Sequence, residues 1–99
     1  MEIAKTKNGS TLEVALTGRL DTTTAPQLEE SVMPELDDVT ELIFDFAKLD
    51  YISSAGLRVM LTSQKAMNKK GTMKIKNVSE DIMEVFTITG FTDILTIEQ

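Results

Sequence analysis

The chain has 99 residues, 41% of them hydrophobic and 26% charged, a composition typical of one globular domain with a packed core. Its formal net charge of -6 disfavours nucleic acid and anionic membrane surfaces as partners. The absence of cysteine and histidine excludes disulfides, thiolate nucleophiles and Ser-His catalysis, and it removes the commonest metal ligand.

The first predicted element is a β-hairpin. Residues 2–7 and 11–17 flank Asn8-Gly9, a pair that readily adopts the positive φ angles of a tight turn. In the second strand, apolar residues alternate with polar or small ones, which predicts one buried face. We expect this strand to end near residues 18–21.

A helix is predicted from Thr24 to about Leu36, because apolar residues recur there at helical spacing. Thr24 and Gln27 fit a capping box around Pro26. Pro34 is expected to kink the last turns or to end the helix early. The apolar run 41–46 then has the pattern of a strand covered by helices, and we predict it at the centre of the sheet.

The second half of the chain alternates helices and strands in the same way. A helix is predicted over 54–70, with Gly71 at its C′ position after two lysines. A strand over 72–76, a helix capped by Ser79 and ended by Gly90, and a last strand over 94–97 follow. This order predicts an α/β fold with a mixed sheet of four to five strands and about three helices.

Residues 50–61, with the sequence DYISSAGLRVML, place two serines between the third strand and the second helix. Neither serine fits a nucleophile motif, because Leu57 stands where Ser-x-x-Lys needs lysine and Ile52 where a nucleophile elbow needs glycine. Glycine motifs that cradle phosphates are absent and the acidic residues are scattered. We therefore predict that the chain is not an enzyme and has no catalytic residue, and that it binds no metal and no cofactor.

Two interpretations of Ser53 and Ser54 remain. In the first, one of them only caps the helix, a contribution of about 1 kcal/mol. In the second, one hydroxyl is a substrate for modification by another protein. One serine is enough for a cap, and the small residues Ala55 and Gly56 leave the other hydroxyl uncovered.

The serine junction, preceded by Leu-Thr-Gly-Arg-Leu-Asp at residues 16–21, resembles the bacterial anti-sigma factor antagonists of the STAS (sulphate transporter and anti-sigma antagonist) domain family. The resemblance covers nearly the whole chain and implies a single STAS-type domain over residues 1–99. It implies a binding module that sequesters an anti-sigma factor with serine kinase activity and so frees a sigma factor. Phosphorylation by that kinase ends the interaction, and a PP2C-type phosphatase restores it.

The resemblance also implies the site residues. In the family motif Asp-Ser-Ser/Thr-Gly-Leu the first hydroxyl accepts the phosphate, and alignment on Gly56-Leu57 makes this Ser54. Ser53 stands where the family has aspartate, which leaves Ser53 as the alternative acceptor. The predicted partner surface consists of Asp21, Thr22, Ser53, Ser54, Gly56 and Arg58.

The alternative function is a STAS-type adaptor subunit of a signalling or transport complex, without phosphorylation, in which Ser54 is only a cap. The chain has no apolar signal-peptide core and no run of about 20 apolar residues, so we expect a cytoplasmic location. Family members often continue into a further helix beyond the last strand, so we expect a less covered sheet edge or face here, available for self-association.

Overall fold

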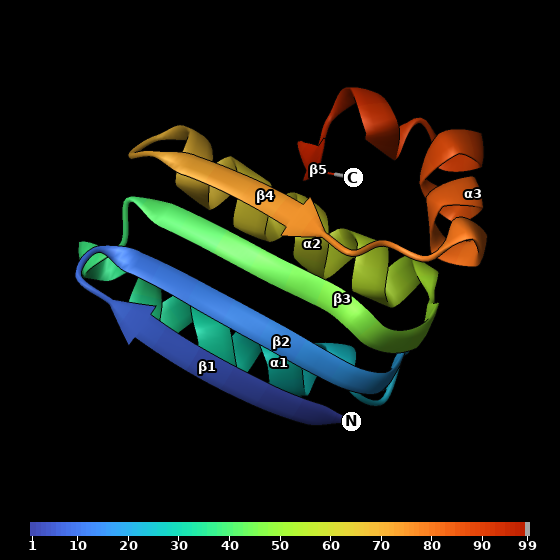
Figure 1. Ribbon diagram of the computed structural model, residues 1–99, viewed down its shortest axis with the longest axis horizontal. Helices are drawn as coiled ribbons and strands as arrows, with labels where there is room; N and C mark the ends of the chain where they lie inside the picture. The colour runs from blue at the N-terminus through green and yellow to red at the C-terminus, as the bar shows by residue number, and fades with distance from the viewer. Residues whose placement is uncertain (99) are drawn as a thin grey trace.

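A five-stranded sheet forms the middle of the computed structural model, which describes residues 1–98. Its strands lie side by side in chain order: β1 (Glu2–Asn8), β2 (Thr11–Leu20), β3 (Glu41–Ile52), β4 (Thr72–Lys76) and β5 (Ile97–Glu98) (Figure 1). β1 and β2 form the predicted antiparallel hairpin, and every later pair is parallel. The predicted α/β class, the mixed sheet and the central position of residues 41–46 are confirmed.

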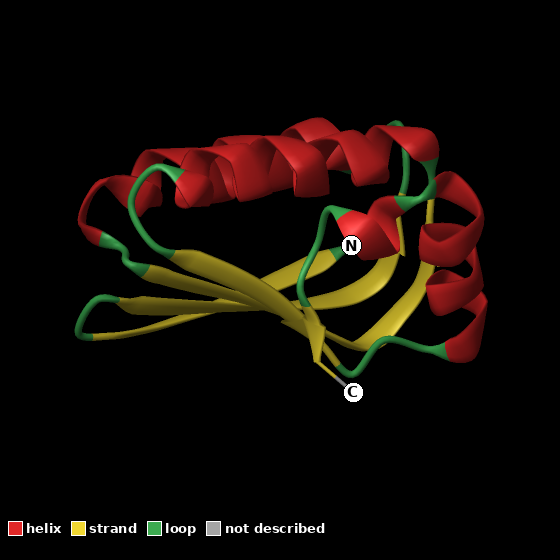
Figure 2. Ribbon diagram, turned by 90° about the horizontal axis from the view of Figure 1, so that it is seen from above, coloured by secondary structure: helices red, strands yellow, loops and turns green. Residues whose placement is uncertain are grey.

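The helices of the described residues lie on one face of the sheet and at one end of it (Figure 2). α1 (Ala25–Val32) and α2 (Ser54–Asn68) lie side by side over the face, and α3 (Glu80–Thr89) stands at the end. No helix of residues 1–98 covers the other face. Residues 41–46 are therefore covered on one side only, because Phe44 and Phe46 point to the helices while Ile43 and Asp45 stay half-buried on the open face.

β3 is longer than the sequence predicted, because two β-bulges extend it. Ala15 pairs with Asp45 but Thr17 with Lys48, and a second shift follows between Gly18 and Arg19. Each shift inserts one extra residue in β3, so the buried positions change from every second residue to every third. The strand thus reaches Ile52 with its apolar side still turned to the helices.

Proline ends the first helix early, which is one of the two outcomes predicted for it. α1 stops at Val32, and the 3₁₀ segment η1 (Met33–Asp38) continues the chain with Pro34 in its first turn. Pro34 has no amide hydrogen to donate, so an α-helical hydrogen bond is lost there. The tighter 3₁₀ turn accommodates that loss and still buries Leu36.

The last strand was predicted wrongly at its start. A 3₁₀ segment, η2 (Phe91–Asp93), follows α3, and β5 begins only at Ile97. Phe91 O accepts hydrogen bonds from the amides of Ile94 and Leu95, which keeps these residues in a turn. The predicted cap of α3 is confirmed, since Ser79 Oγ accepts from the Ile82 amide, and Gly90 ends the helix with a φ of 80°.

The predicted C′ position of Gly71 is wrong. α2 ends at Asn68, its C-cap residue Lys69 has a φ of -83°, and Gly71 is not among the glycines with positive φ. A Cβ at position 71 would instead lie 1.9 Å from the carbonyl oxygen of Thr40. Glycine is needed here because two backbone segments pass close together.

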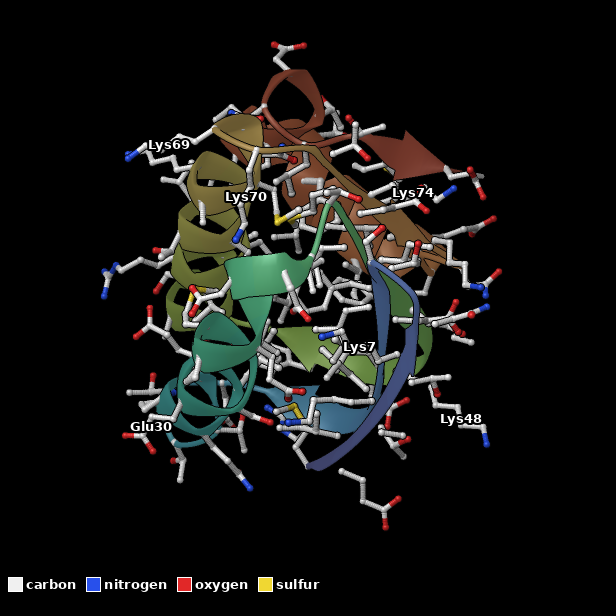
Figure 3. All side chains as sticks on the ribbon, turned by 90° about the vertical axis from the view of Figure 1, so that its left-hand side faces the viewer. Lys7, Glu30, Lys48, Lys69, Lys70 and Lys74 are labelled. Carbon is white, nitrogen blue, oxygen red and sulfur yellow. The ribbon has the colours of Figure 1, made fainter. Side chains whose placement is uncertain are left out.

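Two lysines from different elements contact η1 (Figure 3). Lys7 of β1 pairs with Asp38, and Lys70 donates to the carbonyl oxygen of Leu36. By contrast, Lys69, Lys48 and Glu30 project away from the layers into solvent. Exposed ion pairs contribute little individually, so we attribute the position of η1 mainly to burial of Leu36.

We expect Gly71→Ala to lower the free energy of unfolding by about 1–3 kcal/mol, because the new methyl group forces the Thr40 carbonyl to move. Urea denaturation of the variant measures this loss. Lys69→Ala, an exposed change two residues earlier, is the matched control and should stay close to wild type. Equal stability of the two variants would show that the close approach carries no energetic constraint.

Candidate functional site

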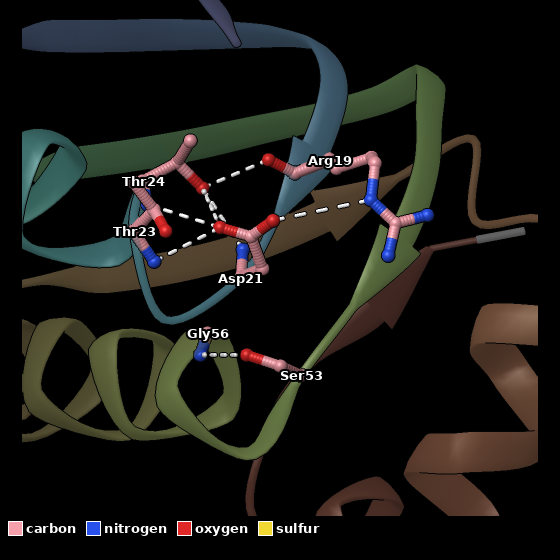
Figure 4. A network of polar contacts seen from close by, with 6 residues as sticks. All are labelled: Arg19, Asp21, Thr23, Thr24, Ser53 and Gly56. Carbon is pink, nitrogen blue, oxygen red and sulfur yellow. Dashed lines mark hydrogen bonds and ion pairs between the residues drawn. The ribbon is translucent and has the colours of Figure 1, made fainter.

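Two chain segments far apart in sequence meet at the end of the sheet where α1 and α2 begin. The last residues of β2 and β3, Leu20 and Ile52, are paired, and the Ser53 amide donates a hydrogen bond of 2.9 Å to the Leu20 carbonyl oxygen. This bond brings Asp21, which follows β2, close to the serine junction that follows β3 (Figure 4). The predicted site residues of both segments therefore lie at one end of the molecule.

Asp21 and Thr24 cap the turn that leads into α1. Asp21 Oδ1 accepts hydrogen bonds from the amides of Thr23 (3.0 Å) and Thr24 (3.1 Å). In return, the Asp21 amide donates to Thr24 Oγ1 at 2.9 Å. The predicted capping box of Thr24 with Gln27 is wrong, since Thr24 makes no side-chain cap of α1. A capping box does form, but three residues earlier, between Asp21 and Thr24.

These amides and a nearby cation stabilise the negative charge of Asp21. The hydrogen bond from the Thr24 amide lowers the pKa of Asp21 most, and the Thr23 amide and the charge of Arg19 lower it further. Partial burial acts in the opposite direction and raises this pKa, but the net shift is downward. Arg19 Nε lies 3.9 Å from Asp21 Oδ2. The guanidinium of Arg19 also stacks on the Tyr51 ring, 4.2 Å from its centroid.

The two serines have different structural roles. Ser53 is the N-cap of α2, with extended backbone angles, and its Oγ accepts from the Gly56 amide at 3.4 Å. Ser54 is the first helical residue; its side chain is exposed and makes no hydrogen bond within residues 1–98. The cap interpretation therefore applies to Ser53, and it leaves the Ser54 hydroxyl accessible.

Gly56 lies beneath this surface and not on it. It is buried, and a Cβ there would be 2.7 Å from Leu20 Cγ and 2.8 Å from Ile52 Cγ1. Gly56 therefore allows the first turn of α2 to pack directly on the ends of β2 and β3. The structure gives it this packing role, and it presents no side chain to a partner.

Thr22 and Arg58, the other predicted partner residues, are exposed at a groove between α1 and α2. We call this the helix groove; its volume is about 240 Å³. Small and apolar side chains from both helices line it together with one acid and one base: Thr22, Ala25, Pro26, Glu29, Ala55, Arg58 and Val59.

The stacking of Arg19 on Tyr51 and the contribution of Glu29 to the helix groove were not predicted from the sequence. Both depend on how distant segments are placed, and no local motif signals them. No cluster of three or more potential metal ligands occurs within residues 1–98. No helix in that range has the length and apolar character needed to cross a membrane.

Comparison with known proteins gives consistent similarities. A family model described as the STAS domain matches residues 2–99. The anti-sigma-B factor antagonist of Bacillus subtilis (strain 168) is 32% identical over 92 residues, covering 92% of this chain and 84% of that protein. The anti-sigma-B factor antagonist of Staphylococcus aureus (strain NCTC 8325 / PS 47) is 32% identical over 101 residues, covering 100% of this chain and 94% of that protein.

Solved structures share the fold. The Bacillus cell fate determinant SpoIIAA in its phosphorylated form matches with a TM-score of 0.78 at 20% identity, covering 99% of this chain and 92% of that one. An anti-sigma factor antagonist from Mycobacterium paratuberculosis matches with a TM-score of 0.87 at 18% identity, covering 97% of this chain and 83% of that one.

The capping role of Asp21 predicts a pH-dependent loss of stability. The pKa of Asp21 is lowered in the folded chain, so its contribution is present above the usual value of 3.8 and disappears as the pH falls through the lower folded value. Asp21→Asn keeps an acceptor oxygen but not the charge. We expect this variant to be less stable than wild type at pH 7 and equal to it in strong acid.

Urea midpoints across the pH range measure this difference. Glu30→Gln, an exposed change on α1, removes the same charge from a residue that caps no turn and serves as the control. If the urea midpoints of wild type and Asp21→Asn still differed in strong acid, the stabilising role of the Asp21 charge would be contradicted.

Proposed function

Because the chain belongs to the STAS domain family, we propose that it is an anti-sigma factor antagonist, a binding module and not an enzyme, whose partner is an anti-sigma factor. The observation that carries the proposal is the division between the two serines. Ser53 caps α2, while Ser54 stays exposed at the start of the helix without a structural task in residues 1–98.

The partner surface in this proposal is the end of the molecule that carries Asp21, Thr22, Ser53, Ser54 and Arg58. All five side chains are charged or carry a hydroxyl, and all are exposed or half-buried. Four of them lie in a turn or at a helix start, and Arg58 lies one helical turn later. Gly56 supports this surface from below. The proposed location is cytoplasmic, because an anti-sigma factor acts on the transcription machinery.

Phosphorylation of Ser54 is the proposed switch, with a serine kinase activity of the anti-sigma factor as its source and a PP2C-type phosphatase as its reversal. A phosphoserine carries about -1.5 to -2 charges, which the free amides and the dipole of a helix N-terminus tolerate. In a partner interface beside Asp21, the same charge is repelled and costly to desolvate. Phosphorylation should therefore end binding and leave the fold intact.

Ser53 is the less suitable acceptor. Its side chain is half-buried and its Oγ already accepts from the Gly56 amide. A kinase would have to break that cap to reach it. We therefore assign the proposed phosphate to Ser54.

Incubation with ATP and the cognate kinase, followed by mass spectrometry, tests the switch. We expect one added phosphate on wild type and on Ser53→Ala, and none on Ser54→Ala. Absence of phosphate on wild type, together with retained partner binding, would favour the adaptor function.

Binding measurements test the consequence of the charge. We expect Ser54→Asp to bind the anti-sigma factor at least about tenfold more weakly than Ser54→Asn, which has nearly the same shape and no charge. Equal affinities of the two variants would contradict a charge-operated switch at this position. Circular dichroism should show the same fold for both.

A further inference from the structure

Arg58 lies one helical turn after Ser54 on the same side of α2. Residues four apart on a helix are neighbours, with their Cβ atoms about 5–6 Å apart. Helical side chains also lean towards the N-terminus, so an arginine at position 58 can reach the turn that Ser54 begins. Both residues are exposed, and no other element of the described chain separates them from solvent.

Arg58 is the arginine at this end of the molecule that has no ionic partner among residues 1–98. Arg19, the other one, is engaged by the Tyr51 ring and by Asp21. Within residues 1–98, Arg58 makes neither an ion pair nor a side-chain hydrogen bond, although Glu29 also lines the helix groove. Its guanidinium is thus free to bind an anion.

We propose that Arg58 is the intramolecular partner of the phosphate on Ser54, an inference that rests on the proposed function of Ser54 as an acceptor. A guanidinium presents parallel N–H donors that match two phosphate oxygens. The order along the helix is also the favourable one, because an acid four residues before a base agrees with the helix dipole. The acidic groups nearby, Asp21 and Glu29, oppose the phosphate charge, and Arg58 compensates for them.

This contact gives phosphorylation a second effect on the partner surface. In the unmodified chain, Arg58 provides the positive charge of the helix groove, and Glu29 provides the negative one. When the Arg58 guanidinium binds the phosphate, its positive charge is no longer available to a partner in the groove. The phosphate therefore adds negative charge at Ser54 and also changes the electrostatic character of the groove beside Ala55.

Phosphorus NMR of the protein with phosphoserine incorporated genetically at position 54 tests the contact without any kinase. The second ionisation of the phosphate, near pH 6, is followed by its chemical shift. A guanidinium in contact favours the dianion, so we expect the midpoint to lie about 0.3 pH units lower in the Arg58 protein than in Arg58→Gln. Arg58→Lys should restore part of this difference.

Lys65→Gln is the matched control. It removes the same charge from the same helix, but position 65 lies about 16 Å along the axis from Ser54, and the change should leave the midpoint unchanged. Asp21 and Glu29 are present in every variant, so their effect cancels in the comparison. Coinciding titrations of wild type and Arg58→Gln would overturn the proposal.

The outcome is independent of whether a kinase recognises Ser54. Absence of enzymatic phosphorylation together with a lowered midpoint would contradict the proposed function and retain the Arg58 contact. Phosphorylation with an unchanged midpoint would retain the proposed function and exclude the contact.

Discussion

The close approach of α2 to the ends of β2 and β3 is the constraint on which the site depends. Gly56 makes it possible, because any side chain there would collide with Leu20 and Ile52. The hydrogen bond from the Ser53 amide to the Leu20 carbonyl then fixes the junction laterally. Together these contacts place Ser54 at the same end of the molecule as the Asp21 turn and hold α2 against α1, which creates the helix groove. A shift of α2 away from the strands would separate the two halves of the site without unfolding either one.

The bulges of β3 explain both how the strand reaches this junction and why its second half escaped prediction. Residues 41–46 were correctly predicted as a central strand, although helices cover only one of its faces. Phe46, Leu49 and Ile52 are buried at a spacing of three, which no strand template contains. Asp45 supports the first bulge by accepting from the Ala47 amide at 3.0 Å. Burial alone would raise the pKa of Asp45, but this bond and one from Asn77 lower it. Such a network depends on the register between strands, so the linear sequence cannot reveal it.

The placement of the candidate site was predictable where a short motif determines it, and the local cap was unpredictable where two motifs compete. The family resemblance of residues 16–21 and 49–57 is confirmed by the sequence similarities, and the two segments do lie together. The cap of α1 was placed three residues too late, because Thr24 fits a cap with Gln27 as well as one with Asp21. The end of β2 decides between them, since it orients the Asp21 amide towards Thr24 Oγ1. Gly71 was misassigned for a similar reason: a glycine after a helix usually adopts positive φ, but here the passing Thr40 backbone requires it.

The identity of the cap connects the stability of this junction with its proposed regulation. An aspartate at position 53 could also cap α2, but it would place a full negative charge directly beside a phosphate on Ser54. Serine gives a weaker, neutral cap, as the 3.4 Å bond to the Gly56 amide indicates. The negative charge of Asp21, at the same end of the molecule, is already compensated by its amides and Arg19. A neutral cap followed by an exposed hydroxyl and an arginine one turn later therefore suits a helix start that must remain folded with and without the phosphate.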